Sequence, residues 1–422
     1  MIVPKEQIDK KAMLLLSLNE GKFISESASK KAQSKLAALD FPTRKTEDWR
    51  YTRTNKIASG SWIINSVESS DISKYTIEGL DCHTLVLING EIQSGLSDIY
   101  TQEGVTISSI KEVSNVDGLG FDSLTNQDAI FTPLNTAFAT NGAFVHIQKN
   151  VQLEKPLHII NLSQGENTGS QSRNLFVCEA LSECSVIESF YSDEKTSFSN
   201  VVSEIFVKDG AKMTYDKIQY RSLNHSQVAS DFVHQEKNST FSINTITLNG
   251  GWVRNGLNIE VDGENCETYL NGLYLLKDNQ HVDNHTLVDH KKAHCMSSEL
   301  YKGIADDTAK GIFNGKVFVR PNAQKIEAFQ QNNNIVMSDS ASINAKPELE
   351  IYADDVKCSH GSTTGQFDEE AVFYLRARGV SETNARKLLV SAFSNEVIDH
   401  ISSEEVKTKI YQLLEERFAW TF

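Results

Sequence analysis

Three observations predict a mainly β protein with helical regions at both ends. Between about residue 84 and residue 355, short stretches rich in Val, Ile, Phe, Tyr and Thr are separated by Gly, Asn and Asp. No helical period persists through this part of the chain. Both ends instead carry apolar residues at helical spacing. We therefore expect a helical and mixed N-terminal region (1–85), a β core (86–365) and a helical C-terminal region (366–422).

The N-terminal region is predicted to begin as a helix. Up to about residue 40, apolar side chains recur at helical spacing, at Ala12, Leu15, Leu16, Ala32, Leu36 and Leu39. The apolar run 12–18 is short and lacks a small-residue cleavage site after it, so we interpret it as a helix face rather than a secretion signal. No run approaches the length of a membrane span. We expect a cytoplasmic protein that does not contact a membrane.

The β core is predicted from its strands and the turns between them. Candidate strands lie at 84–88, 175–177, 203–207, 241–248, 257–261 and 315–319. A pattern of Ile-x-Val followed by Thr-Tyr occurs at 205–215 and again at 259–269, an offset of 54 residues (259 − 205). Such an echo is typical of a β-solenoid built of stacked coils. A sandwich with two chemically similar strands would also explain it.

The C-terminal region is predicted to contain three helices. Asp368 can cap the first helix, over 369–378, and Gly379 would end it. Ser381 can cap the second, and the run 402–405 has the sequence of a capping box for the third. The second helix carries one apolar stripe, formed by Ala385, Leu388, Leu389, Ala392 and Phe393.

Charge and motifs argue against several classes of function. The chain has 41 basic and 56 acidic residues, a net charge of −15, which argues against a nucleic-acid partner. It has no P-loop, no dinucleotide-binding fingerprint and no nucleophile elbow, so we expect no nucleotide site of its own. Its six cysteines are scattered without a Cys-x-x-Cys pair, which indicates neither a disulfide framework nor a resident cluster or zinc site.

The densest group of potential metal ligands is His281, His285, His290 and His294, followed by Cys295. On a helix, the first two histidines would share a face and could bind zinc. The residues between them are typical of a strand, in which positions four apart lie ~13 Å apart, too far for one metal. Spacing therefore favours a structural role for the four histidines over a metal site.

A second candidate site is the pair Cys358 and His360. In a strand, both side chains would lie on one face, ~6.6 Å apart at Cα, a spacing that suits two ligands presented to a metal or cluster. A nearby cation such as Lys357 would favour the thiolate form of the cysteine. The residues alone favour a buried cysteine beside a solvated histidine over a ligand pair.

Longer ordered motifs run from residue 41 to about residue 395 and are dense after residue 280. They lie at 42–51, 283–290, 301–304, 311–316, 323–333, 347–361 and 365–379. Together they resemble the SufB/SufD family of the SUF machinery for iron–sulfur cluster assembly, and among its members the SufD proteins. The most specific motif is 347–361, which contains both Cys358 and His360.

The resemblance implies a non-catalytic scaffold subunit, built as a right-handed parallel β-helix with helical ends. It implies a heterodimer with the paralogue SufB through the last β-coils, with a transient cluster held at this seam near Cys358 and His360. It also implies docking of the SufC ATPase on the helical tail. The candidate docking residues are Phe373, Arg376, Arg378, Gly379, Ala385, Leu388, Leu389 and Phe393.

Two alternatives from other functional classes remain open at this stage. A β-helix enzyme acting on polysaccharide would need a groove with carboxylates, and a metalloprotein would need its histidine cluster to bind zinc. Flavin binding by the assembled complex and self-pairing of the isolated chain are also left open, as are the cluster type and the order of assembly steps.

Overall fold

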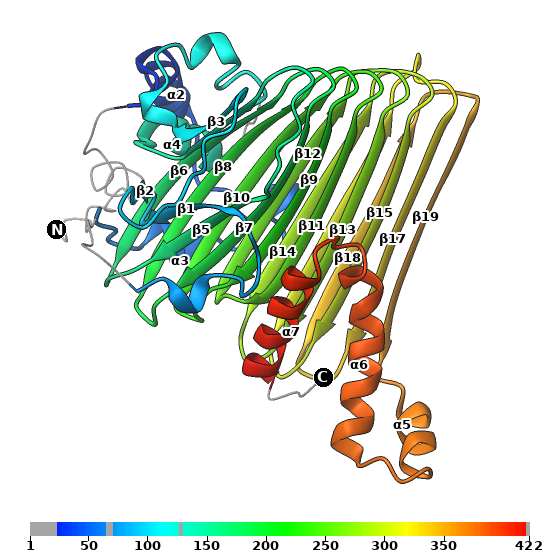
Figure 1. Ribbon diagram of the computed structural model, residues 1–422. Helices are drawn as coiled ribbons and strands as arrows, with labels where there is room; N and C mark the ends of the chain where they lie inside the picture. Colours follow the sequence, from blue (N-terminus) through cyan, green and yellow to red (C-terminus); the bar gives the residue numbers. More distant parts are fainter. Residues whose placement is uncertain (1–22, 65–70, 126–129, 419–422) are drawn as a thin grey trace, which may run out of the picture.

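The computed structural model describes residues 23–64, 71–125 and 130–418. Two large sheets face one another and are built from stacked coils, each coil giving one strand to each sheet (Figure 1). Apart from antiparallel pairs β1–β2 and β3–β4 at one end, neighbouring strands are parallel. The predicted β-solenoid is therefore confirmed, and the sandwich alternative is wrong.

The ten-stranded sheet has the order β19-β17-β15-β13-β11-β9-β7-β5-β1-β2. Its strands, in chain order, are β1 (His83–Ile88), β2 (Glu91–Ile92), β5 (Leu157–Ser163), β7 (Glu183–Ser192), β9 (Lys212–Tyr220), β11 (Thr240–Asn249), β13 (Glu267–Leu276), β15 (Met296–Ala305), β17 (Ile326–Val336) and β19 (Val356–Gln366).

The nine-stranded sheet has the order β18-β16-β14-β12-β10-β8-β6-β4-β3. Its strands, in chain order, are β3 (Val105–Ser109), β4 (Ala143–Ile147), β6 (Thr168–Cys178), β8 (Ser197–Val207), β10 (His225–Gln235), β12 (Trp252–Val261), β14 (His281–His290), β16 (Lys310–Val319) and β18 (Ser342–Ile351). Each of the six predicted strand stretches lies within a strand of one sheet or the other.

The 54-residue echo in the sequence spans two coils. Ile205 pairs with Val233, which pairs with Ile259 on the following coil, so the Ile-x-Val half of the pattern is in register. The other half is displaced by one residue, because Thr214 pairs through Ser242 with Tyr269 rather than with Thr268.

The space between the sheets is filled by the side chains that point inward from every second position of each strand. One column of paired inward positions crosses the ten-stranded sheet from β7 to β19; we call it the interior column. It begins apolar and ends polar, and its members are Val186, Tyr215, Ile243, Leu270, Glu299, Gln330 and His360.

Two C-terminal helices, α6 (Glu382–Ile398) and α7 (Glu404–Phe418), cover the outer face of the ten-stranded sheet, and α5 (Glu369–Arg376) packs against α6. Outward residues of the sheet such as Ile246 and Leu273 form one apolar cluster with Val397 and Ile410 of these helices. Beyond the region that α6 covers, α5 and the start of α6 project away from the solenoid (Figure 1).

The predicted caps of the C-terminal helices are largely confirmed. Asp368 accepts a hydrogen bond from the N–H of Ala371, and Ser381 caps α6 in the same way. The third helix differs from the prediction by one residue, because Ser403, not Ser402, accepts the N–H of Val406. No helix in the described ranges combines the length and apolarity needed to cross a membrane.

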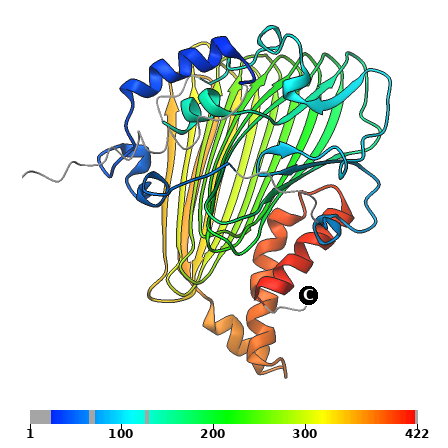
Figure 2. The same cartoon turned by 90° about the vertical axis from the view of Figure 1, so that its left-hand side faces the viewer.

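The described residues 23–62 lie on the opposite side of the solenoid from α6 and α7 (Figure 2). Helix α2 (Glu26–Ala38) buries Ala32 and Leu36 as predicted, whereas Ala12, Leu15 and Leu16 lie outside the described residues. Residues 40–62, which we call the N-terminal strap, run along the outer face of the nine-stranded sheet and include α3 (Asn55–Ala58).

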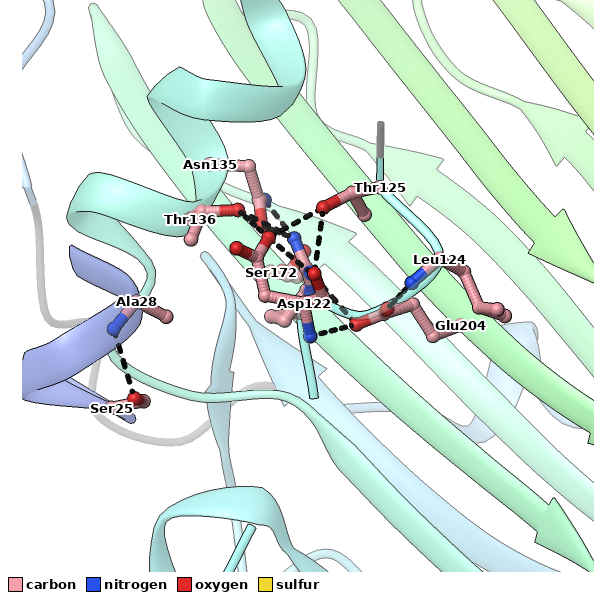
Figure 3. A network of polar contacts seen from close by, with 10 residues as sticks. Ser25, Ala28, Asp122, Leu124, Thr125, Asn135, Thr136, Ser172 and Glu204 are labelled. Atoms are coloured by element: carbon pink, nitrogen blue, oxygen red, sulfur yellow. Dashed lines mark hydrogen bonds and ion pairs between the residues drawn. The ribbon is translucent and has the colours of Figure 1, made fainter. Parts of the chain in front are cut away.

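A buried polar network connects the first coils to residues 122–125 and to α4 (Phe131–Phe138) (Figure 3). Arg173 of β6 is fully buried and donates to Glu204 of β8 at 2.7 Å and to Thr136 of α4 at 3.0 Å. Glu204 also accepts the backbone N–H groups of Asp122 and Leu124 at 2.7 and 2.9 Å. Both oxygens of this buried carboxylate therefore have hydrogen-bond donors.

Candidate functional site

The last coil leaves the solenoid open at one end. β18 and β19 are the terminal strands of the two sheets, and among the described strands each pairs on one side only, with β16 and β17. The backbone groups of their outer edges are therefore available for another chain. Large apolar side chains are exposed near this end, at Ile351 of β18, at Tyr352 just after it and at Phe329 of the neighbouring β17.

Cys358 and His360 lie on β19 at this open end. As their spacing predicted, both lie on one face of the strand; this is the inward face, with Cys358 opposite Ala328 and His360 opposite Gln330. The thiol is half-buried and packs against the core, whereas the imidazole is exposed. Both side chains thus lie on the terminal strand at the open end of the solenoid, the Cys358 thiol half-buried and the His360 imidazole exposed.

The electrostatics of Cys358 differ from the expectation. Burial raises the pKa of its thiol above the usual value. Lys357, which was expected to favour the thiolate, lies on the opposite face and is ion-paired with Glu327 at 2.7 Å. The alternation of a strand explains this result, since neighbouring residues point to opposite sides. In the isolated chain Cys358 is therefore a protonated thiol at neutral pH.

The histidines of residues 281–294 are divided between the two sides of β14. His281 and His285 point outward to the strap, where His281 is 3.0 Å from Thr52 and His285 is 2.9 Å from Asp283. His290 points inward, and burial lowers its pKa to about 4. His294 lies in the following turn with a φ of 62°. Among the described residues, no three His, Cys, Asp or Glu side chains form a group that could hold a metal.

Sequence reasoning missed the contact that joins the strap to β12 and β14. Asp283 is buried and binds both Arg254 and the hydroxyl of Thr52, while the Arg254 guanidinium lies 3.9 Å from the Trp49 ring. Burial alone would raise the pKa of Asp283, but Arg254 and His285 hold it well below its usual value. Two of the ordered motifs, at 42–51 and 283–290, thus meet in space, which no local pattern in the sequence indicates.

The predicted docking residues of the tail do not form one free surface. Phe373, with 74% of its surface exposed, and Leu388, with 53%, are exposed to solvent, as are Arg376, Arg378 and Gly379. Ala385 is completely buried, and Leu389 and Phe393 pack against the apolar cluster under the helices. Part of the stripe on α6 therefore faces the protein itself, because the helix must cover the sheet.

A groove beside Leu388 adds to the exposed part of the tail. It has a volume of about 510 Å³ and is lined by Val380, Asn384, Lys387, Leu388, Ser391, Asn395 and Tyr411, from α6, the turn before it and α7. The groove and Phe373 give this end of the molecule an apolar, concave surface.

A larger groove of about 940 Å³ runs between the strap and the nine-stranded sheet, and its lining includes carboxylates. Glu47 is bound to Lys346 and Glu350 to Lys316, and each lysine lowers the pKa of its partner. A glycosidase needs one carboxyl with a raised pKa as its general acid. These two paired carboxylates have the opposite property, so the groove does not favour the polysaccharide alternative.

Comparison with known proteins identifies the class to which this solenoid belongs. The SufBD core domain of the SUF system for FeS cluster assembly matches residues 160–393, and the SufBD N-terminal region matches residues 17–159. The chain therefore belongs to the SufBD family of iron–sulfur cluster assembly proteins.

Similar curated proteins include SufD itself. The iron–sulfur cluster assembly protein SufD of Escherichia coli is 30% identical over 92% of this chain and 93% of its own length. A SufBD family protein of Synechocystis is also 30% identical, over 89% of this chain and 87% of its own. SufD of Bacillus subtilis is 26% identical over 68% of this chain and 66% of its own.

Proposed function

We propose that this chain is a SufD-type scaffold subunit, without turnover of its own, that pairs with a SufB-type partner through the open end of its solenoid. The observation that carries the proposal is the position of Cys358 and His360 at that end, beside the unpaired edges of β18 and β19. A partner that continues either sheet would cover both side chains and bring its own ligands to them.

In this arrangement the iron–sulfur cluster is a cargo rather than a resident cofactor. His360 offers an exposed imidazole, which can ligate iron directly. Cys358 starts as a protonated, half-buried thiol, so it needs both access and the loss of a proton before it can ligate. We therefore assign the first contact with iron to His360 and give Cys358 a later role.

We further propose that the exposed surface of α5 and α6 docks a SufC-type ATPase. Phe373, Leu388 and the groove beside them support this assignment, because an exposed concave apolar surface is typical of a partner site. Lys302 of β15 donates hydrogen bonds to the backbone carbonyl of Phe393 and to the carboxylate of Glu396, both on α6. A displacement of α6 would therefore be transmitted to the ten-stranded sheet, whose last strand forms part of the open end. The cytoplasm is the compartment we propose, because a reducing environment suits the six free cysteines.

The test is co-expression of the chain with SufB and SufC homologues, followed by assay of bound iron and sulfide and of transfer to an apo-ferredoxin. His360→Ala should strongly reduce transfer, and Cys358→Ala should reduce it less. Ser359→Ala, on the outward side of the same strand, and His400→Ala, an exposed histidine far from β19 in the sequence, should leave it unchanged. Unchanged transfer in His360→Ala would refute the ligand role.

A further inference from the structure

The end of the interior column contains a polar chain that leads to His360. Gln330 lies between Glu299 on the preceding coil and His360 on the following one, and all three occupy inward positions. Paired residues on parallel strands lie ~4.8 Å apart, so each side chain stacks on the next. The exposed imidazole of His360 is therefore the neighbour, on the last coil, of the buried amide of Gln330.

The Gln330 amide is hydrogen-bonded to the preceding coil. Its side chain is 3% exposed, and its Nε2 donates to Glu299 Oε2 at 2.7 Å. The other carboxylate oxygen, Oε1, accepts from Thr286 at 2.5 Å. Gly315 on the facing sheet leaves room for the amide, because a Cβ there would lie 2.4 Å from Gln330 Nε2. These contacts fix which end of the amide faces Glu299.

The other end of the same amide lacks a partner. Gln330 Oε1 is buried and accepts no hydrogen bond from any described residue. A buried carbonyl oxygen left in this state is costly, and the great majority in proteins are paired. With Nε2 committed to the preceding coil, the next polar side chain along the column is His360, and an imidazole N–H is a donor that suits a carbonyl oxygen.

We propose that Gln330 is the positioning residue of His360: its Oε1 accepts the ring N–H, which leaves the lone pair of the other nitrogen free to bind iron. Glu299 and Thr286 hold Gln330 in the orientation that this bond requires. The inference deepens the proposed function and rests on it for the role of iron. In metal sites, a hydrogen bond to the distal nitrogen of a ligating histidine fixes its tautomer and raises its affinity.

The first test measures the tautomer of His360 in the full chain without metal. Histidine is labelled with ¹⁵N, and the His360 signals are assigned by their loss in His360→Ala. We expect one neutral tautomer in the unsubstituted chain and a mixture in Gln330→Met, which keeps the side-chain shape but removes the amide. Gln331→Met is the matched control, because Gln331 is the next residue on β17 and is exposed on the opposite face.

The second test measures binding of Zn²⁺ as a redox-inert probe of the same site. Gln330→Met should weaken the His360-dependent binding by about 10-fold or more, as is typical for loss of such a supporting bond, and Gln331→Met should not. Circular dichroism checks that each variant folds. If Gln330→Met does not, Glu299→Gln replaces it, and the tautomer ratio should shift toward a mixture because the amide loses its fixed orientation.

The outcomes separate the two proposals. An unchanged tautomer ratio in a folded Gln330→Met chain would overturn the positioning role, whatever His360→Ala does to cluster transfer. A changed ratio together with normal transfer by the His360→Ala complex would support the hydrogen bond and remove the cluster role of His360.

Discussion

Replacement of Glu204 by Gln should release the segment around residue 122 from the first coils. Glu204 is fully buried and accepts Arg173 and two backbone N–H groups, those of Asp122 and Leu124. The Gln side chain has the same shape but carries no charge, and one of its two ends is a donor that faces a donor. At least one charge-assisted bond is lost, and among the described residues the buried Arg173 then keeps Asp122, at 3.4 Å, as its one anionic partner.

The expected cost is about 3 kcal/mol, near the lower end of the range for breaking a buried ion pair. Since each ~1.36 kcal/mol changes an equilibrium constant tenfold, local opening should become about 100-fold more frequent. Hydrogen exchange measured by mass spectrometry on peptides covering 118–125 reports this opening directly. The protection of Asp122 and Leu124 should fall by this factor.

The matched control is Glu179→Gln, in which the substituted side chain is 38% exposed and lies 3.3 Å from His146. An exposed pair of this kind contributes less than ~1 kcal/mol, so protection around residue 122 should not change. Equal protection of residues 118–125 in Glu204→Gln and the unsubstituted chain would show that the network in Figure 3 does not anchor this segment.

Three further predictions follow from single contacts. Burial raises the pKa of Glu299 from 4.5 to about 7, so its contribution to stability is present below pH 4.5 and is lost as the pH rises to 7. At pH 8 the Glu299→Gln chain should therefore be more stable than the unsubstituted chain, by up to about 3 kcal/mol, and should melt at a higher temperature. At pH 4.5 the gain should be small, and an equal gain at both pH values would contradict the shift. Ser403→Ala should lower the stability of α7, measured by hydrogen exchange, by about 1 kcal/mol, and Ser402→Ala should leave it almost unchanged. The reverse order would show that Ser402 caps the helix, as the sequence predicted. Phe373→Ser combined with Leu388→Ser should weaken the binding of a SufC homologue, measured by calorimetry, at least tenfold without lowering the melting temperature. The control Leu181→Ser, at an exposed turn on another coil, should leave the affinity unchanged. Equal affinities of the double variant and the unsubstituted chain would exclude this surface as the docking site.

The sequence predicted the parts of the fold that depend on local pattern. Turn residues separate the strands, and Asp368 and Ser381 cap their helices as expected, because these signals act within a few residues. The offset of 54 residues indicated stacking, but its two halves differ by one residue in register, and only the pairing of Ile205 with Val233 and Ile259 shows that two coils are involved.

The parts that were not predicted depend on contacts between distant residues. Asp283 is buried although it points outward, because the strap brings Thr52 across more than 200 residues of sequence to cover it. Strands that are covered on both faces lose the alternation that separates inner from outer positions. The sequence could not distinguish the inward Gln330 from the outward Gln331 for a different reason: residues 330–334 of β17 are all Gln or Asn, so the amino-acid types do not alternate although the burial does.

The unpaired edges of β18 and β19 also bear on the oligomeric state of the isolated chain. Both edges lie on the last coil, at one end of the solenoid, so a second copy of this chain could pair with them. Because the same edges of both copies would then be used, such pairing would end at a closed dimer. In the absence of the proposed partner, this chain should therefore form dimers whose fraction rises with protein concentration, which analytical ultracentrifugation measures.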